Sequence, residues 1–355
     1  MMKLLDEIVA LSHEFGTRDY VKGGGGNTSY KSSTVLWVKP SGTTLAGMTP
    51  PAFVAMDRTA MQRLYSLEIP SDPQAREALV RDTMAAAVAP GSSGRPSVEA
   101  PLHELLPGAF VVHTHPALVN GMTCSKRGAE TCARLFPEAL WIPYIDPGYT
   151  LCMDVRRRVL DFSKKQGHAP ALLFLENHGV FVTGDTGDQI RAIYRHVMET
   201  LCSEYASKGV ATTMRVSDPG SAERIDVDRK AIAAAMGTDA ALIVHSGAFP
   251  VPQGPVSPDH IVYSKSFPYT GALRAGDFQA YQKERGAMPR VIVTSAGVFG
   301  VASTPKQADL ALELAQDGAL VCQLAAAFGG IQYMTDRARL FIENWEVESY
   351  RQKQV

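Results

Sequence analysis

The segment ALLFLENHGVFVT, residues 171–183, constrains the fold more than any other part of the sequence. Two apolar runs typical of buried strands, residues 171–175 and 180–183, are separated only by the turn-forming residues ENHG. So short a connection joins antiparallel neighbours, because parallel strands need a crossover of a dozen or more residues. The chain is therefore expected to contain a sheet that is at least partly antiparallel.

Helical patterns surround these strands. Ser71 and Asp72 supply a cap and Pro73 a first-turn proline for one helix, and Gly16 ends the pattern of another. The fold class that follows is mixed α/β, with a partly antiparallel central sheet flanked by helices. Helices are predicted over residues 3–15, about 73–89, about 153–166 and about 187–207, with a further strand over 35–39.

The polar, turn-rich segment 216–228 suits a domain boundary, and 355 residues suffice for two domains. The expected division is a larger domain over residues 1–215 and a smaller α/β unit over residues 225–355. Residues 290–309 of that unit, RVIVTSAGVFGVASTPKQAD, align without a gap with residues 172–191, so that Gly297 corresponds to Gly179. This predicts a degenerate repeat, with chance similarity as the alternative. Ala296 stands in the second copy where the first has His178.

The composition argues for a cytoplasmic protein that acts on small molecules. The chain carries 35 basic and 36 acidic residues, so no net field attracts nucleic acid or an anionic membrane. Asp6 and Glu7 interrupt the apolar stretch that a signal peptide needs, and no apolar run approaches about 18 residues. The five cysteines are scattered and form no CxxC pair, which is typical of a reducing compartment.

Residues 110–116, FVVHTHP, end an apolar strand with two imidazoles. Side chains alternate along a strand, so His113 and His115 point to the same face. His178, in the turn ENHG, can supply a third imidazole at a sheet edge. Three histidines that leave a position free are a common catalytic zinc site. The alternative for the pair is two histidines hydrogen-bonded within a half-buried strand.

A carboxylate precedes this strand in RPSVEAPLHELLPGAF. Ser97 is a plausible N-cap, which places Glu99 in the first turn of a short helix that ends near Pro107. A carboxylate beside a Lewis-acid metal suits proton transfer next to a carbonyl. The alternative role for Glu99 is to interact with the helix dipole.

Three donor-rich turns can together hold one phosphate without a lysine. The run KGGGGNTSYK offers backbone N–H groups and the side chains of Asn27, Thr28 and Ser29. The turn PSGTT at residues 40–44 and the segment at residues 96–97 offer more donors. A surface loop and a plain turn are the alternatives, because neither motif is a dinucleotide or P-loop fingerprint.

The motifs GGGNTS, WVKPSGT, PSVEAPLHELLP, VVHTHP and ENHG, in this order, resemble those of the class II aldolase/adducin family. The resemblance covers about residues 1–210. The segments SPDHIVYSK and FIENWEVES resemble the end of the aldolase portion of bifunctional rhamnulose-phosphate aldolase/dehydrogenases. Family members are zinc enzymes that form rings, so the resemblance implies a homo-oligomer, possibly a tetramer.

The resemblance also implies roles for individual residues. It makes His113, His115 and His178 the zinc ligands and Glu99 the catalytic acid/base. Val98 stands where sugar-phosphate aldolases often have a second serine, and no tyrosine matches the proton donor of fuculose-phosphate aldolases; Tyr144 and Tyr149 are candidates. The residues implied to line the phosphate site are Asn27, Ser41, Gly42 and Ser97.

The resulting hypothesis is a zinc-dependent retro-aldol cleavage of a ketose 1-phosphate to dihydroxyacetone phosphate and an aldehyde. The same site also suits an epimerase, dehydratase or decarboxylase of a sugar or sugar-acid phosphate. A zinc hydrolase and a metal-free, adducin-like binding protein are further alternatives. The role of the C-terminal unit is left open by the sequence.

Overall fold

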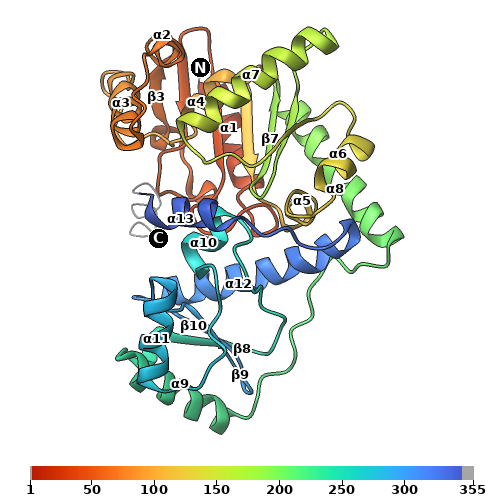
Figure 1. The fold of residues 1–355 in the computed structure, drawn as a ribbon. Coiled ribbons are helices and arrows are strands. Elements are labelled where there is room, and N and C mark those ends of the chain that lie inside the picture. Colours follow the sequence, from red (N-terminus) through yellow and green to blue (C-terminus); the bar gives the residue numbers. More distant parts are fainter. Residues whose placement is uncertain (1, 346–355) are drawn as a thin grey trace. The chain divides into compact units, whose positions relative to one another are not determined.

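The structure is a computed structural model that describes residues 2–345 (Figure 1). It divides into two compact units. Of the described residues, 2–119 and 128–201 belong to the first unit, and 120–127 and 202–345 to the second. The histidine, glutamate and glycine motifs all lie in the first unit.

A seven-stranded sheet in the order β3-β2-β1-β4-β7-β6-β5 organises the first unit. β5 and β6 are parallel and the other neighbouring pairs are antiparallel, which confirms the predicted mixed sheet. The strands are β1 (Asn27–Lys31), β2 (Val35–Val38), β3 (Val54–Asp57), β4 (Phe110–Thr114), β5 (Leu140–Ile142), β6 (Leu172–Leu175) and β7 (Gly179–Gly184).

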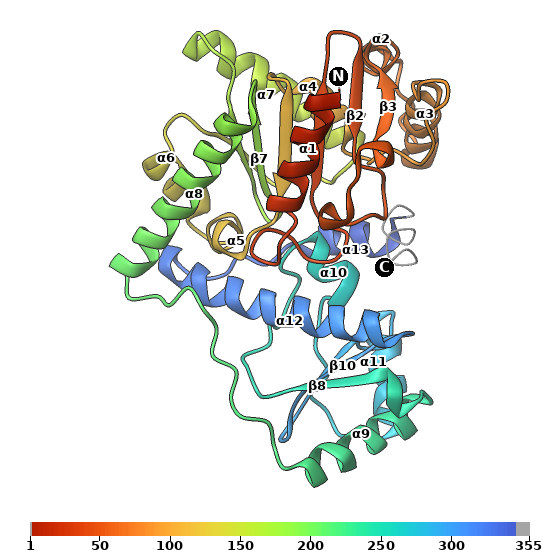
Figure 2. The same ribbon diagram turned by 180° about the vertical axis from the view of Figure 1, so that it is seen from behind.

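Helices cover both faces of this sheet. Helices α4 (Ala100–Leu105) and α7 (Tyr149–Gln166) lie on one face, seen in Figure 1, and α1 (Met2–Glu14) and α8 (Gly187–Ser207) on the other, seen in Figure 2. Side chains alternate between the two faces of the sheet along β4. Thr114 therefore points to the face covered by α8, where its hydroxyl lies 2.8 Å from the Tyr194 hydroxyl. The other helices of this unit are α2 (Arg58–Gln62), α3 (Pro73–Ala86), α5 (Ala117–Thr123, which continues into the second unit) and α6 (Gly128–Leu135).

Strands β1, β3 and β5 are not among the predicted strands. The segment NTSYK, predicted as part of a donor-rich turn, is a fully buried strand, β1, between β2 and β4. Its polar side chains have partners: the Thr28 hydroxyl lies 2.7 Å from that of Ser12, and the Ser29 hydroxyl 2.7 Å from Nδ1 of His103. Thr28 and Ser29 are thus bound within the protein rather than presented to an anion.

A three-stranded antiparallel sheet in the order β8-β10-β9 organises the second unit. One apolar cluster joins it to α12, and a second joins it to α9 and α11 (Figure 2). Ser221 caps α9 by accepting from the N–H of Arg224, so residues 222–228 begin a helix rather than a linker. The elements are α9 (Ala222–Met236), β8 (Ile243–Ser246), α10 (Pro258–Ser264), α11 (Ala275–Arg285), β9 (Val291–Thr294), β10 (Gly297–Val301), α12 (Pro305–Ala325) and α13 (Asp336–Asn344).

The predicted repeat corresponds to two hairpins in the structure, β6–β7 and β9–β10, which can be compared with each other. Both are followed by helices of 21 residues, α8 and α12, and the order β4-β7-β6 matches β8-β10-β9. Thr186 and Thr304 each accept a hydrogen bond from the N–H three residues on, at 3.2 Å in both cases. The alignment does not hold for the strands that precede the two turns, because the connection from β6 to β7 comprises residues 176–178 and the connection from β9 to β10 only residues 295–296. The pairing of β9 with β10 is therefore shifted by one residue relative to that of β6 with β7.

One helical stretch, residues 305–328, is long and apolar enough to cross a membrane by length and composition. Its apolar window is 61% buried within the structure, and α12 packs on the three-stranded sheet. The stretch also includes Glu313 and Asp317. We interpret it as a core helix.

Candidate functional site

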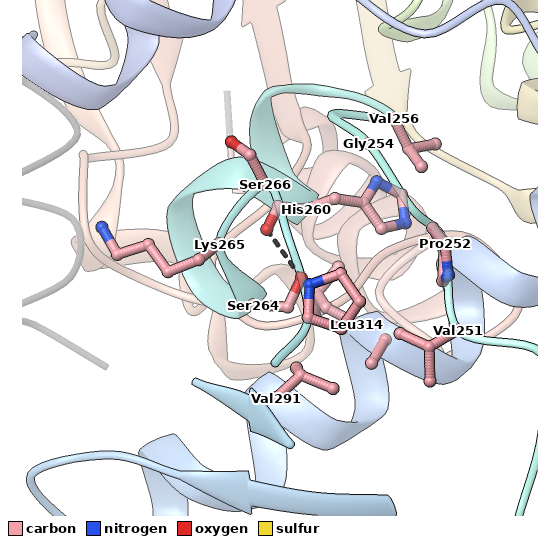
Figure 3. Close-up of a pocket in the computed structure, with 12 residues that line it drawn as sticks. Val251, Pro252, Gly254, Val256, His260, Ser264, Lys265, Ser266, Val291 and Leu314 are labelled. Atoms are coloured by element: carbon pink, nitrogen blue, oxygen red, sulfur yellow. Dashed lines mark hydrogen bonds between the residues drawn. The ribbon is translucent and has the colours of Figure 1, made fainter. Parts of the chain in front are cut away.

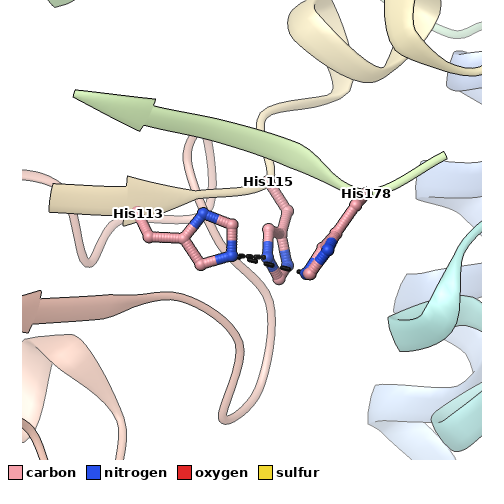
Figure 4. A group of neighbouring side chains, drawn as sticks. All are labelled: His113, His115 and His178. Carbon is pink, nitrogen blue, oxygen red and sulfur yellow. Dashed lines mark hydrogen bonds between the residues drawn. The ribbon is translucent and has the colours of Figure 1, made fainter. Parts of the chain in front are cut away.

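Three imidazoles meet where β4 ends and β7 begins (Figure 4). His113 is in β4, His115 directly follows it, and His178 ends the turn between β6 and β7. Because β4 and β7 are neighbouring antiparallel strands, the end of one lies beside the start of the other. Nε2 of His113 lies 2.9 Å from Nε2 of His115 and 3.4 Å from Nε2 of His178.

These three nitrogens fit a metal ion. Tetrahedral zinc with Zn–N bonds of 2.0–2.1 Å requires its nitrogen ligands to lie about 3.3 Å apart. Nδ1 of His113 lies 2.9 Å from the carbonyl oxygen of Val180 and can donate to it, which leaves Nε2 for a metal. The ring also stacks on Phe181, with centroids 3.8 Å apart and planes 7° apart. The His113 ring is thus fixed before any metal binds.

The turn ENHG owes its shape to two residues. Asn177 is buried with a φ of 52°, a left-handed conformation that asparagine tolerates better than most residues. A Cβ at Gly179 would lie 2.4 Å from the carbonyl oxygen of Thr114 and 2.7 Å from Cδ2 of His115. Glycine is therefore needed there for β7 and the His115 ring to approach each other.

Glu99 lies against the histidines. Its Oε1 is 3.3 Å from Nε2 of His113 and 3.6 Å from Nε2 of His178, and its Oε2 accepts a hydrogen bond from the side-chain amide of Asn27. The predicted cap was wrong by two residues: Glu99 itself is the N-cap of α4, and the Ser97 hydroxyl accepts from the N–H of Glu99 at 3.2 Å. The cap position aims the carboxylate at the imidazoles.

The electrostatics of Glu99 favour the carboxylate form. Burial by itself raises the pKa of Glu99, but the charge and hydrogen bond of His113, followed by the charges of His178 and His115, hold that pKa well below its usual value. A bound divalent cation acts in the same direction. A carboxylate that sits at a three-histidine site and accepts an amide hydrogen bond can take a proton from a neighbouring carbon acid and return it.

The structure brings together two of the three predicted donor turns. Pro40 bridges to Pro96, and the N–H of Ser41 donates to the carbonyl oxygen of Arg95 at 2.9 Å. This places Ser41 and Gly42 beside the segment that leads to Ser97. Gly42 has a φ of 82°. Asn27, the predicted donor from the third turn, opens β1 and donates its side-chain amide to Glu99, whose own N–H donates to the Ser97 hydroxyl.

The two candidate tyrosines differ in their surroundings. Tyr149 is the first residue of α7 and packs in an apolar cluster with residues such as Leu36 and Val54. Burial raises the pKa of Tyr149, which opposes loss of its proton. The N–H of Tyr144 donates to the carboxylate of Glu176 at 3.1 Å. Tyr149 is thus a packing residue of this apolar cluster.

Sequence reasoning overlooked His103 and Lys31, which support the helix behind Glu99. Lys31 donates to the carbonyl oxygens of His103, at 2.7 Å, and Leu106, so it closes the C-terminal end of α4. Burial lowers the pKa of Lys31 to about 7. His103 is fully buried, and burial lowers its pKa to about 3. The available signal was the spacing of four residues from Glu99 to His103, which stacks the two residues on one face of α4.

The pKa of His103 predicts a loss of stability in acid. The folded pKa of about 3 is below the unfolded value of 6.5, so between these pH values the unfolded chain binds more protons. The free energy of unfolding should therefore fall as the pH drops from 6.5 towards 3, by at most about 1.4 kcal/mol per pH unit from this group. In urea unfolding of the chelator-treated parent chain and of the His103→Asn variant, the two free energies of unfolding should converge as the pH falls from 6.5 towards 3. A gap that stays constant would contradict the assignment, and His168→Gln, at an exposed histidine, is the control.

Of the three histidine positions in the first unit, only that of His113 has a histidine counterpart among the described residues of the second unit. His245 pairs with Phe299 across β8 and β10, just as His113 pairs with Phe181 across β4 and β7. Its Nε2 lies 3.1 Å from the carbonyl oxygen of Ala296, the residue that aligns with His178. Within residues 2–345 the only group of metal-ligating side chains found is the set of three histidines in the first unit.

A protein-family profile and a curated relative match about half of this chain. The profile of the Class II Aldolase and Adducin N-terminal domain matches residues 6–206, more than half of the chain. The "Uncharacterized oxidoreductase YuxG" of Bacillus subtilis strain 168 is 30% identical over 197 residues, which cover 52% of this chain and 27% of YuxG. The chain thus spans about a quarter of the length of that relative.

Solved structures with similar folds cover the same region. The N-terminal class II aldolase domain of a conserved protein from Thermoplasma acidophilum is 26% identical, with a TM-score of 0.48, and the match covers 56% of this chain and 92% of that one. L-fuculose-1-phosphate aldolase from Thermus thermophilus is 13% identical, with a TM-score of 0.37, over 59% of this chain and 98% of that one. From the profile match, together with the sheet that carries the motifs, this chain belongs to the class II aldolase and adducin family.

Proposed function

We propose that this protein is a zinc-dependent aldolase that cleaves a ketose 1-phosphate to dihydroxyacetone phosphate and an aldehyde. The observation that carries the proposal is the convergence of three imidazole nitrogens and one buried carboxylate, with Glu99 within 3.3 Å of His113. Class II aldolases are generally metal-dependent lyases, so family membership supports the same conclusion. Residues 1–215 form the catalytic region in this proposal.

His113, His115 and His178 would hold the divalent cation. When bound, such an ion acts as a Lewis acid that polarises the carbonyl group of the substrate. The two imidazole contacts of Glu99 place its carboxylate beside the same position, so it can reach a carbon next to that carbonyl. Asn27 orients Glu99 through the amide hydrogen bond.

In the proposed cleavage the bond between C3 and C4 of the ketose breaks and its electron pair stays on C3. Glu99, as the carboxylate, takes the proton of the C4 hydroxyl, which becomes the aldehyde carbonyl. The protonated Glu99 then delivers this proton to C3, which completes dihydroxyacetone phosphate. The hydroxyl of Ser97 and the turn of Ser41 and Gly42 would bind the phosphate through neutral donors, close to Glu99 along the chain.

A second candidate uses the same site for epimerisation, dehydration or decarboxylation of a sugar or sugar-acid phosphate. The observation that favours it is the packing of Tyr149 in the core, since fuculose-type cleavage is expected to use a tyrosine as a proton donor. All these reactions pass through an enolate-like species next to a carbonyl. The three histidines and Glu99 suit that species in each case.

A substrate screen separates these reactions. The zinc-loaded chain would be incubated with a panel of ketose 1-phosphates and sugar-acid phosphates, and dihydroxyacetone phosphate, aldehyde and carbon dioxide would be measured in parallel. We expect dihydroxyacetone phosphate and aldehyde in equal amounts from at least one ketose 1-phosphate, and none after chelation. Release of carbon dioxide alone, or epimerisation without cleavage, would replace the aldolase proposal with the second candidate.

The proposal extends to the state of the protein in the cell. A net charge of −1 and cysteines that are all free support a cytoplasmic enzyme with small-molecule rather than nucleic-acid or membrane partners. A homo-oligomer, possibly a tetramer, is part of the proposal and can be measured by light scattering. Purified protein with well below one zinc per chain and no phosphate binding would favour the adducin-like binding role instead.

A further inference from the structure

The residue that follows α10 has a backbone conformation that lysine seldom adopts. Lys265 has a φ of 68° and a ψ of 165°, and within residues 2–345 the only other non-glycine residue with a positive φ is Asn177 of the histidine turn. Such strain persists only where the surrounding structure imposes it, and it clusters at binding and catalytic sites. The backbone at Lys265 thus fixes the direction of a charged side chain.

The ammonium group of Lys265 lacks a partner in the described part of the chain. Lys265 is partly buried and lines a cavity of the second unit together with the buried residues Ser264 and Ser266. No hydrogen bond or ion pair links its Nζ to any residue between 2 and 345. Burial and the nearby charge of Arg290 lower the pKa of Lys265, and Glu343 opposes that shift only in part. An uncompensated, partly desolvated cation favours binding of an anion.

The nearest carboxylate is already bound by other groups. Glu343 accepts a hydrogen bond from the Ser266 hydroxyl at 2.7 Å on Oε1 and from Arg339 at 2.7 Å on Oε2. Arg290 donates to the carbonyl oxygens of Val262 and Tyr263, at 3.3 and 3.1 Å, near the C-terminal end of α10. The negative end of that short helix is thus occupied as well, and Glu343 acts on Lys265 through its charge without forming an ion pair with it.

More positive charge surrounds the segment that follows. The guanidinium groups of Arg285 and Arg339 lie 4.3 and 5.5 Å from the centroid of the Phe267 ring. Both arginines are paired with carboxylates: Arg285 with Glu284 at 2.9 Å, and Arg339 with Asp336 at 3.3 Å and with Glu343 at 2.7 Å. Lys265 has no such ion pair within residues 2–345, so its ammonium group is the cation of this segment that is left for an added anion.

We propose that Lys265 is the centre of a binding site for a small oxyanion, the phosphate or carboxylate group of a small molecule, in the C-terminal unit. Figure 3 shows the Lys265 side chain extending away from the ring of His260. That ring instead faces Ser257, with Nδ1 2.7 Å from the hydroxyl, and Asp317, with Nε2 3.2 Å from Oδ2. The anion site is independent of the proposed aldolase chemistry and gives the second unit a function of its own.

The test uses the full-length chain, with lysines reductively methylated with 13C-formaldehyde, which keeps their charge. The NMR signal of dimethylated Lys265 is identified by its absence in Lys265→Met. We expect this signal to move saturably on addition of inorganic phosphate or of acetate, and the two probes distinguish a phosphate from a carboxylate ligand. No movement with either probe, or equal movement at the exposed Lys283, would overturn the proposal.

Thermal unfolding supplies a second readout that does not depend on catalysis. Lys265→Gly should raise the Tm without anion, because glycine adopts a φ of 68° without strain, and Lys265→Met should keep the backbone and lose the charge. In both variants the increase in Tm caused by the active probe should be smaller than in the parent chain and in Lys283→Met. An undiminished increase in both variants would overturn the proposal, whatever the substrate screen shows.

Discussion

Replacing His115 with alanine is expected to lower the affinity for zinc by roughly 10³, because the free energy of binding a structural zinc, about 10–16 kcal/mol, is shared among only a few ligands. His115 is the cleanest ligand to remove. His113 is fully buried and stacked on Phe181, so its loss would also leave a cavity, whereas His115 is only partly buried. Metal content by mass spectrometry and kcat/KM for the substrate found in the screen would both fall.

The control for this experiment is His168→Ala. His168 is exposed, is paired with Glu138 and lies outside the three-histidine group, so metal content and turnover should stay at the level of the parent chain. A His115→Ala chain that still holds one zinc per subunit at full affinity would show that the imidazoles of β4 and the ENHG turn do not share one ion. The enzymatic proposal would then lose its basis.

Glu99→Gln is expected to lower kcat by roughly 10² to 10⁴ while zinc remains bound, which is the usual contribution of a general acid–base. Glutamine keeps the shape of the side chain and its oxygen can still accept from Asn27, but it cannot carry a proton to and from carbon. Because the lost negative charge lies within 3.6 Å of two imidazoles, zinc affinity should also weaken. The comparison must therefore be made at saturating zinc.

Glu104→Gln is the matched control, since Glu104 lies in the same helix, is similarly buried and pairs with Arg58 at 2.8 Å. Loss of that ion pair should reduce stability and leave kcat within a few-fold of the parent value. If Glu99→Gln and Glu104→Gln have the same kcat at saturating zinc, Glu99 has no part in proton transfer. A selective loss in Glu99→Gln, with KM little changed, separates chemistry from binding.

The three histidines of the candidate metal site could be singled out from the sequence because the features that mark them are local. The alternation of strand side chains places His113 and His115 on one face whatever the rest of the fold, and the short ENHG connection makes β6 and β7 antiparallel. The long helix α8 was predicted at residues 187–207 and is found there, because its amphipathic pattern extends over many turns. These features need no knowledge of distant parts of the chain.

Strand β1 shows where such reasoning fails. The sequence NTSYK has few apolar residues, and it becomes a buried strand only because β2 and β4 pair with it on both sides and because Ser12 and His103 bind its hydroxyl groups. Asn27, the first residue of this strand, donates its amide to Glu99, a contact that no local pattern predicts. The groups that bind the side chains of this strand lie 16 to 75 residues away, and no local pattern contains them.

The sequence by itself determined the mixed sheet, the three imidazoles and the carboxylate, because periodicity and turn chemistry act over a few residues. The tertiary structure alone decided which strand lies beside which, and so brought His178 to within 3.4 Å of His113 and Asn27 to Glu99. It also decided that Lys265 has a strained backbone and forms no ion pair within residues 2–345. The physical reason is that burial and pairing depend on contacts between segments far apart in sequence, whose energies no single segment encodes.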